Sequence, residues 1–352
     1  MQTTQRIADF RSDTVTQPTP AMRQAMAQAE VGDDVLDGDP SVARLERLAA
    51  DWLGKEGALF VPSGTMANQI ALGAHTRPGD EIVVQRFAHV TTFEAGSAGA
   101  LHGLQTMTLG GLEGSMSAED LVGVLRPNFI HCPKTALICM EQTHNMAGGR
   151  IVPLASVEAI AEVAQGAGIP MHLDGARLAN AVVRTGIDAR TWCRPFASVS
   201  LCLSKGLGAP VGSVLTGHGA FLERARLVRK RLGGWMRQAG HLAEAGRLAL
   251  EEGLAHLEQD HALAQSIVHS LADVAGLEVE PELVETNMVM VGLGPGLPAA
   301  QAAIERLAGA GVRVSGMGPR RLRIVTHRDV GPLEAERLLA ALRALARECA
   351  AG

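Results

Sequence analysis

Tyrosine is absent from this chain of 352 residues, and aromatic residues make up only 3% of it. The absence removes the phenol from the possible catalytic acids, bases and stacking partners, so these roles fall to histidine. Lysine is nearly as scarce, with Lys55, Lys134, Lys205 and Lys230 the only four among 32 basic residues. Chemistry that needs an amine therefore has four candidates.

Long apolar runs and paired cysteines are also lacking. No uncharged apolar run approaches the roughly 18 residues of a membrane span, and residues 1–10 lack the apolar core of a signal peptide. We therefore predict a cytoplasmic protein without a membrane partner. The five cysteines are widely spaced and never form a C-x-x-C pair, so we predict neither a disulfide framework nor a metal site.

The charge pattern argues against nucleic acid as a partner. The formal net charge is −5, and the arginines are scattered, so there is no sustained positive field for a phosphate backbone. Hydrophobic residues make up 47% and charged residues 20%, values that are typical of a folded globular protein.

Apolar runs alternate with helical patterns between residues 57 and 217. Several of the runs are apolar at nearly every position, as strands buried on both faces are. They span residues 58–61, 81–84, 135–140, 169–173, 197–203 and 212–216. The segments between them have helical spacing, as at Val157, Ile160 and Ala164. This alternation predicts an α/β protein with a mostly parallel sheet wrapped by helices.

A second, smaller domain is expected near the C-terminus. Residues 221–275 have an almost continuous helical character and predict the connection to it. Short apolar runs at 286–291, 312–315 and 322–326 and a helix from about Pro332 then predict an α+β unit. We predict a large domain over residues 1–245, with an N-terminal arm, and a small domain over residues 246–352.

Polar residues that directly follow a strand are the first candidates for function, because ligands of open α/β sheets lie beyond the carboxyl ends of the strands. Ser63, Gly64 and Thr65 follow one strand and open a helix, where free N–H groups can bind a phosphate. Asp174 ends another strand and could pair with a protonated ring nitrogen. Taken alone, Ser63 and Asp174 are more simply explained as helix caps.

Lys205 stands out among the four lysines because it follows the apolar run 197–203 and precedes a glycine-containing loop. Desolvation lowers the pKa of an amine and makes it nucleophilic, as formation of an imine with an aldehyde requires. A phosphate-binding turn, an acid for a ring nitrogen and an amine, each at the end of a strand, together form the set that pyridoxal phosphate requires.

The chain resembles the L-threonine aldolase family of low specificity from about Asp9 to His327. The resemblance is carried by the segments DFRSDTVT (9–16), VGDDV (31–35), SGTMAN (63–68), Ala88-His89, EQTHN (141–145), DGAR (174–177) and LSKGLG (203–208). It implies the aspartate-aminotransferase-like fold (fold type I) of pyridoxal-phosphate enzymes, with a seven-stranded sheet. It also implies cleavage of β-hydroxy-α-amino acids to glycine and an aldehyde by a homotetramer, a dimer of dimers.

The resemblance implies roles for residues around the cofactor. Lys205 would bind pyridoxal phosphate as an imine, and Asp174 would pair with its pyridine nitrogen. Gly64 and Thr65, with Ser63 beside them, would hold the phosphate. His89 would stack on the ring.

Further roles concern the substrate and a neighbouring subunit. Ser12, Arg177 and Arg323 would grip the substrate carboxylate, with Arg177 also beside the cofactor. His131 resembles a second histidine near the β-hydroxyl, so either His89 or His131 would take the hydroxyl proton. Two further residues resemble those that reach a phosphate across the subunit interface, Lys230 and Arg237.

Several alternatives remain open. His131 could be a partly buried structural histidine, and Arg323 a surface ion-pair partner. Leu36 stands near a position where many family members have tyrosine, which leaves fine specificity open. A β-eliminating lyase or an aminotransferase would use the same lysine and aspartate. A non-catalytic cofactor-binding protein is disfavoured because Lys205, Asp174 and both arginines occur together.

Overall fold

One sheet of seven strands organises the part of the chain that the computed structural model describes, residues 7–111, 113–126 and 129–350. Across the sheet the strands are β2 (Gly57–Val61), β8 (Ser213–Gly217), β7 (Ser198–Cys202), β6 (Met171–Asp174), β5 (Thr135–Glu141), β3 (Glu81–Gln85) and β4 (Gln105–Leu109). β8 runs antiparallel to both of its neighbours, and the other pairs are parallel. The predicted mostly parallel, seven-stranded sheet is confirmed.

Side chains along the strands point alternately to two apolar clusters. Leu137 and Cys139 of β5 belong to one cluster, whereas Ile138 and Met140 belong to another. Because both faces are buried, such strands contain few polar positions and stand out as apolar runs in the sequence. The edge strand β4 is exposed or half-buried along its length, and no apolar run predicts it.

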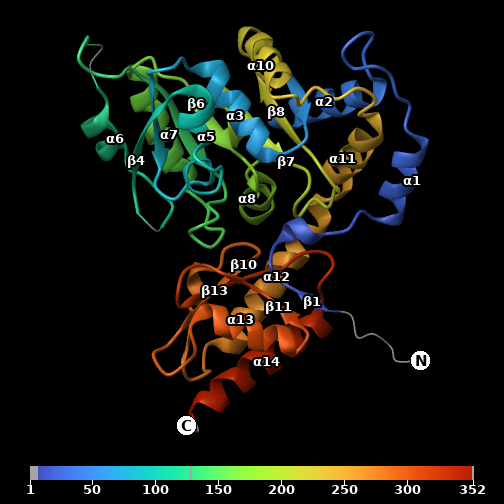
Figure 1. Cartoon of the computed structure of the whole chain (residues 1–352), viewed down its shortest axis with the longest axis vertical. Helices are drawn as coiled ribbons and strands as arrows, with labels where there is room; N and C mark the ends of the chain where they lie inside the picture. Colours follow the sequence, from blue (N-terminus) through green and yellow to red (C-terminus); the bar gives the residue numbers. More distant parts are fainter. Residues whose placement is uncertain (1–6, 112, 127–128, 351–352) are drawn as a thin grey trace.

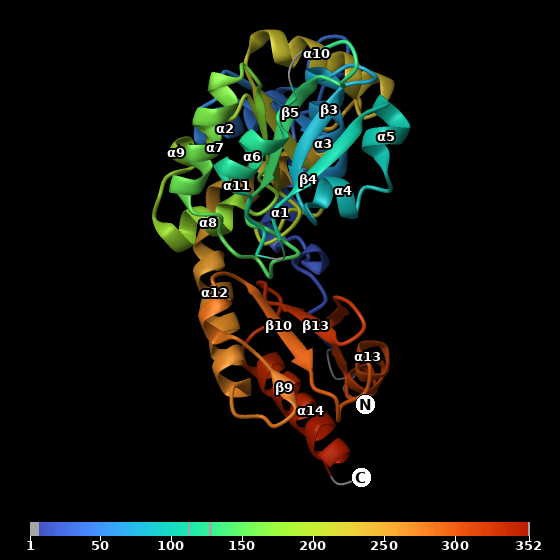
Figure 2. The same cartoon turned by 90° about the vertical axis from the view of Figure 1, so that its left-hand side faces the viewer.

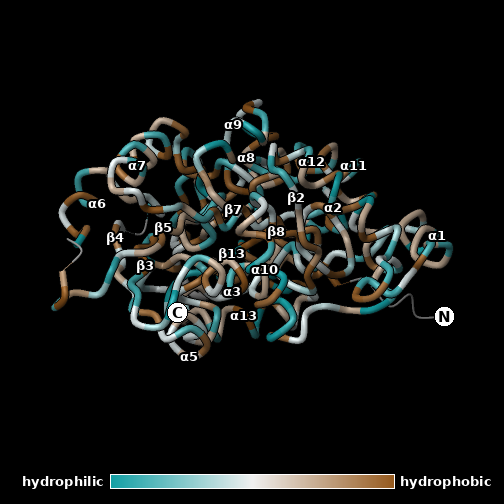
Figure 3. The backbone as a smooth tube through the Cα atoms, turned by 90° about the horizontal axis from the view of Figure 1, so that it is seen from above, coloured by the Kyte–Doolittle hydropathy of each residue, from teal (hydrophilic) through white to brown (hydrophobic). Residues whose placement is uncertain are grey.

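Helices cover both faces of this sheet (Figures 1 and 2). One face carries α2 (Pro40–Leu53), α7 (Leu154–Gly166), α8 (Leu178–Thr185), α9 (Ala189–Cys193) and α11 (Gly240–Glu252), and the other carries α3 (Gly64–His75), α4 (His89–Thr92), α5 (Ser97–His102) and α10 (Gly219–Arg231). Along the surrounding helices, hydrophobic and hydrophilic segments alternate, as expected of helices that pack one face on a core (Figure 3). None of the described helices combines the length and apolar character that crossing a bilayer requires.

The C-terminal part forms a second unit, which Figure 1 shows below the large sheet. Its antiparallel sheet has the order β12 (Ser315–Gly316), β13 (Arg321–Val325), β10 (Met288–Leu293) and β9 (Leu277–Glu278). The helices α12 (Leu254–Leu271), α13 (Ala300–Gly309) and α14 (Pro332–Ala350) pack with it. This is the α+β arrangement that the sequence predicts.

The N-terminal arm is part of the apolar core of this second unit. β1 (Ala8–Asp9) pairs in parallel with β11 (Val312–Arg313), and Ala8 and Phe10 are completely buried in the C-terminal cluster. α12 contributes to both cores, with Leu257 in the large cluster and Ala264 in the C-terminal one. The domain division at residues 245 and 246 stays a prediction.

The burial of Phe10 makes the arm important for stability. We expect Phe10→Ala to lower the free energy of unfolding by about 3–5 kcal/mol, because the substitution leaves a cavity in a packed core. Urea denaturation followed by circular dichroism measures the change. Phe129→Ala is the matched control, since Phe129 is 55% exposed and surface substitutions usually cost about 0.5 kcal/mol or less. Equal effects of the two substitutions would contradict the expectation.

Candidate functional site

A cavity of about 190 Å³ lies where the carboxyl ends of β6 and β7 meet the start of α3. Seven residues singled out in the sequence line it: Ser63, Gly64, Thr65, His89, Asp174, Arg177 and Lys205. Thr14, Asn68, Glu141 and Cys202 are among the other lining residues. The fold therefore brings together residues from six separate segments of the chain.

The N-terminus of α3 forms one wall of the cavity. Ser63 is the N-cap, and its side chain accepts a hydrogen bond from the Met66 N–H at 3.2 Å. The simple interpretation of Ser63 as a helix cap is therefore correct. A Cβ atom at Gly64 would lie 2.6 Å from Sγ of Cys202, so only glycine allows α3 to approach β7 this closely. The free N–H groups of the first turn can hold an anion.

Asp174 is buried at the end of β6 and is held by two donors. Its Oδ2 accepts a hydrogen bond from Nδ2 of Asn68 at 2.8 Å, and its Oδ1 accepts one from the Ala176 N–H at 3.1 Å. Oδ1 of Asn68 in turn accepts a hydrogen bond from the Ser200 hydroxyl at 3.0 Å and lies 3.2 Å from Nε2 of His172. The carboxylate is thus fixed by a buried polar network between α3 and the sheet.

Two histidines of this network are neutral in the folded protein. Burial lowers the pKa of His172 to about 4 and that of His75 to about 3. Both rings contact the hydroxyl of Ser198, each at 2.8 Å. Neutral rings can serve as acceptor at one nitrogen and donor at the other, as a buried network requires. No local pattern in the sequence predicts this network.

Lys205 follows β7 and is half-buried in the wall of the cavity. The Thr16 hydroxyl donates to its backbone carbonyl at 3.2 Å, so the N-terminal arm contacts the lysine loop. The most buried lysine is instead Lys55, whose ammonium donates to the carbonyls of Cys193 and Phe196 at 2.8 and 2.6 Å. Position at the strand end, rather than burial alone, therefore distinguishes Lys205.

His89 lies at the start of α4 with its ring directed toward a buried acid. Its Nδ1 is 2.8 Å from Oε1 of Glu94, and its backbone N–H donates to Oε2 of Glu141 at 2.7 Å. Burial disfavours the charged ring, but the hydrogen bond with Glu94 and the nearby charge of Asp174 outweigh it and raise the pKa of His89. The carboxylates of Glu94 and Asp174 therefore favour the protonated form of the ring.

Arg177 is buried and paired with the N-terminal arm. Its Nε and Nη2 donate to the two oxygens of Asp13 at 2.8 and 2.6 Å. Burial alone would raise the pKa of Asp13, but the charge of Arg177 holds it well below its usual range. The sequence motif contains Asp13, yet the prediction gave it no role.

Arg323 lies beside this pair. Its Nη1 donates to Oδ1 of Asn145 at 2.7 Å, and among the described residues its buried Nε has no hydrogen-bond partner. Burial and the charge of Arg177 lower the pKa of Arg323 to about 10. Ser12 directly precedes Asp13 in the N-terminal arm, and its hydroxyl accepts a hydrogen bond from the Thr14 N–H at 3.3 Å. Neither Arg323 nor Ser12 lines the cavity itself.

Three predicted residues lie on the surface of this chain, outside the cavity lining. His131 is exposed and contacts the Phe129 ring edge to face, with ring centroids 5.0 Å apart. Nζ of Lys230 lies 6.0 Å from the centroid of the Trp235 ring. Arg237 forms an ion pair with Asp33 at 2.8 Å. Their predicted roles would require another subunit or a movement of the chain.

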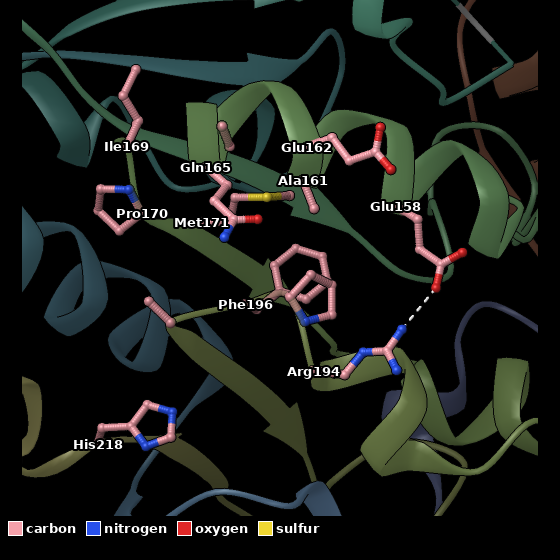
Figure 4. A pocket seen from close by; sticks show the side chains of 13 residues that line it. Glu158, Ala161, Glu162, Gln165, Ile169, Pro170, Met171, Arg194, Phe196 and His218 are labelled. Atoms are coloured by element: carbon pink, nitrogen blue, oxygen red, sulfur yellow. Dashed lines mark hydrogen bonds and ion pairs between the residues drawn. The ribbon is translucent and has the colours of Figure 1, made fainter. Parts of the chain in front are cut away.

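A larger cavity, of about 720 Å³, lies at the opposite edge of the sheet (Figure 4). Met171, the first residue of β6, and Ala197, just before β7, both line it. An ion pair between Arg194 and Glu158, 2.9 Å long, borders it. It lies at the amino ends of the strands, where open α/β sheets do not bind their ligands.

The family model described as "Beta-eliminating lyase" matches residues 9–293. The chain belongs to this family. It is 41% identical over 330 residues to low-specificity L-threonine aldolase 1 of Arabidopsis thaliana, with 92% of each chain covered. It is 39% identical over 323 residues to the low specificity L-threonine aldolase of Escherichia coli K12, with 92% of this chain and 94% of the relative covered. The resemblance predicted from the motifs is confirmed.

Solved structures show the fold of this beta-eliminating lyase family member. The threonine aldolase of Leishmania major has a TM-score of 0.80 at 20% identity and covers 96% of this chain and 99% of its own. A serine palmitoyltransferase of Sphingomonas wittichii has a TM-score of 0.74 at 19% identity, with 97% and 88% covered. The predicted fold type I of pyridoxal-phosphate enzymes is confirmed.

The neutral histidines make stability depend on pH. Because the pKa of His172 falls to about 4 in the fold, the unfolded state binds more protons between pH 4 and about 6.5. We expect stability to fall as pH drops through this window, by about 1.4 kcal/mol per pH unit for this group at most. Urea denaturation at pH 7 and pH 5 measures it.

The matched variants are His172→Asn and His269→Asn. The first should be less stable at pH 7 but should lose less stability on acidification than the original protein. His269 is exposed on α12, so its replacement should leave the pH dependence intact. An unchanged pH dependence in His172→Asn would refute the assignment of neutral, buried His172.

Proposed function

We propose that this protein is a low-specificity L-threonine aldolase that uses pyridoxal phosphate. It cleaves the Cα–Cβ bond of L-threonine, L-allo-threonine and related β-hydroxy-α-amino acids to glycine and an aldehyde. The observation that carries the proposal is one cavity lined by the Lys205 amine, the Asp174 carboxylate and the His89 ring. The chain that contains it is 39–41% identical to threonine aldolases.

The chemistry of the cavity wall fits pyridoxal phosphate. The first turn of α3, with Gly64 close to Cys202, offers N–H donors to a phosphate. Asp174 is a fixed acceptor for a protonated ring nitrogen, and Lys205 is an amine for the aldehyde. When bound, the cofactor supplies a ring that withdraws electrons from Cα of the substrate.

The arginines beside the cavity would hold the substrate carboxylate. The buried Nε of Arg323 has no hydrogen-bond partner among the described residues, whereas Nε and Nη2 of Arg177 both donate to Asp13. We infer that Arg323 makes the main contact and that Arg177 and Ser12 complete the site. Holding the carboxylate orients the substrate, and this orientation selects which bond at Cα is cleaved.

Loss of the β-hydroxyl proton needs a base. His89 lines the cavity and His131 does not, so His89 is the first candidate within one chain. His131 remains the alternative if another subunit or a loop movement brings it to the substrate. In either case the base takes the hydroxyl proton as the Cα–Cβ bond breaks.

We also propose a homotetramer in the cytoplasm, built of dimers that share their sites. Lys230 and Arg237 are exposed and lie outside the cavity of their own chain. Residues so placed are available to reach a phosphate in a neighbouring subunit. A site completed by two chains would explain why Lys230 and Arg237 lie outside the cavity of their own chain.

A β-eliminating lyase is the second candidate, because the matching family model carries that description. Elimination from a β-hydroxy amino acid releases ammonia, whereas aldol cleavage of threonine releases acetaldehyde and leaves glycine. Incubation of the purified protein with L-threonine and with L-allo-threonine, followed by assay of acetaldehyde, glycine and ammonia, separates the two functions. Ammonia in place of acetaldehyde would refute the aldolase.

Lys205→Ala tests the attachment of the cofactor. We expect it to lose the absorbance band of bound pyridoxal phosphate and at least about 10³-fold in cleavage rate, since nucleophilic catalysis requires the amine. Lys134→Ala is the matched control, because Lys134 is exposed and precedes β5. A Lys205→Ala protein that keeps both the band and the rate would refute the assignment.

Mixed subunits test the shared site. Lys205→Ala and Arg237→Ala chains should each have low activity, and a mixed pair should regain one complete site, since it combines an intact Lys205 with an intact Arg237 of the neighbour. Co-expression with two affinity tags isolates the mixed species. Lys205→Ala mixed with Asp174→Asn is the control, because both residues line the same cavity. Absence of rescue in the first mixture would contradict sharing.

A further inference from the structure

Glu94 is a buried acid next to the cavity that neither the motifs nor the cavity lining identify. Its side chain is completely buried. Oε1 accepts hydrogen bonds from Nδ2 of Asn68 and faces Nδ1 of His89, each at 2.8 Å. Oε2 accepts from Nε2 of Gln69 at 2.6 Å. These three contacts hold the carboxylate in one orientation.

Two of these partners tie Glu94 to the helix that opens on the cavity. Asn68 and Gln69 are both on α3, and both are buried. The same Nδ2 group of Asn68 donates to Glu94 and to Asp174, at 2.8 Å each. Any movement of Glu94 would therefore disturb Asp174, the carboxylate that would pair with the cofactor ring. The side chains of Glu94, Asn68 and Asp174 therefore form one hydrogen-bonded unit.

The bond between Glu94 and Nδ1 determines what the His89 ring can do. A carboxylate that accepts from Nδ1–H fixes one tautomer and leaves Nε2 as the nitrogen that can accept a proton. It also stabilises the imidazolium that then forms. The side chain of His89 is 28% exposed whereas Glu94 is 0% exposed, so the ring is the part of the pair that can meet a substrate.

Other charged groups also face His89. Asp174 at the end of β6 favours a charged ring, and Lys205 after β7 disfavours it. Glu141 at the end of β5 accepts from the backbone N–H of His89 and not from its ring. Glu94 is the acid in direct hydrogen-bond contact with the imidazole, so its removal should have the largest effect on the ring.

We propose that Glu94 is the positioning residue that makes His89, through Nε2, the base for the β-hydroxyl proton. The inference rests on the proposed aldolase function. In the step, the O–H bond breaks and an Nε2–H bond forms. The oxygen electron pair becomes the second bond of the aldehyde carbonyl, and the electrons of the broken Cα–Cβ bond remain at Cα. His89 then releases its proton to solvent, and Cα takes up one proton to give glycine, so that the number of protons is unchanged overall.

A direct test measures the ionisation of His89 by NMR on full-length protein with isotope-labelled histidine, before and after cofactor loading. His89→Gln identifies the ring signal. We expect the wild-type ring to titrate above the ordinary histidine value and the ring of Glu94→Gln to titrate lower. Glu141→Gln is the matched control and should shift the ring less. A wild-type ring at or below the ordinary value, or no change in Glu94→Gln, would overturn the inference.

Kinetics give a second readout. A base is active when neutral, so the acid limb of kcat/KM should follow the pKa of His89 and move to lower pH in Glu94→Gln. We expect kcat at neutral pH to fall about 10²-fold, with little change in KM for threonine. Glu94→Asp should recover part of the loss if Glu94→Gln folds poorly. An unmoved acid limb would count against the inference.

The two proposals can fail separately. Absence of acetaldehyde from the wild-type protein would refute the aldolase, while the NMR comparison would still decide whether Glu94 controls His89. Acetaldehyde formation with an unchanged His89 titration in Glu94→Gln would keep the aldolase and overturn the role of Glu94.

Discussion

The hydrogen bonds of the Asn68 amide are the interaction on which the site depends. One Nδ2 group joins Asp174 and Glu94, and Oδ1 of the same side chain contacts Ser200 and His172. Two buried carboxylates close together would repel each other strongly without donors between them. The shared amide and the ring of His89 provide those donors. The site is therefore a single polar unit sealed between α3 and the sheet.

This unit exists because one part of the sheet is polar on the side that α3 covers. His172 and Asp174 of β6 and Ser198 and Ser200 of β7 alternate with Leu173 and Val199, which lie in the apolar cluster on the other face. Because successive side chains of a strand point to opposite faces, the apolar core lies on one face of the sheet and the polar network on the other. Asn68 of α3 lies opposite these polar side chains and forms hydrogen bonds with Asp174, His172 and Ser200. Hydrogen bonds between buried polar groups make such an arrangement rigid.

A second constraint links the N-terminal arm to both parts of the molecule. Asp13 pairs with Arg177 beside the cavity, while Phe10 is buried in the C-terminal cluster. Asn287, just before β10, donates to Oδ2 of Asp13 at 3.4 Å. The arm therefore connects the large sheet, Arg177 beside the cavity and the small sheet. Its position explains why a short polar segment near the N-terminus carries a family motif.

The sequence by itself determined six of the seven strands of the large sheet, seven of the residues that line the cavity and the family, because these depend on local patterns. Runs buried on both faces are apolar, and motifs at strand ends are contiguous in the chain. Tertiary structure alone decided the pairing of Glu94 with His89, of Asn68 with Asp174 and of Asp13 with Arg177. The last two pairs are 106 and 164 residues apart, so they depend on the order of the strands in the sheet. No local period encodes that order.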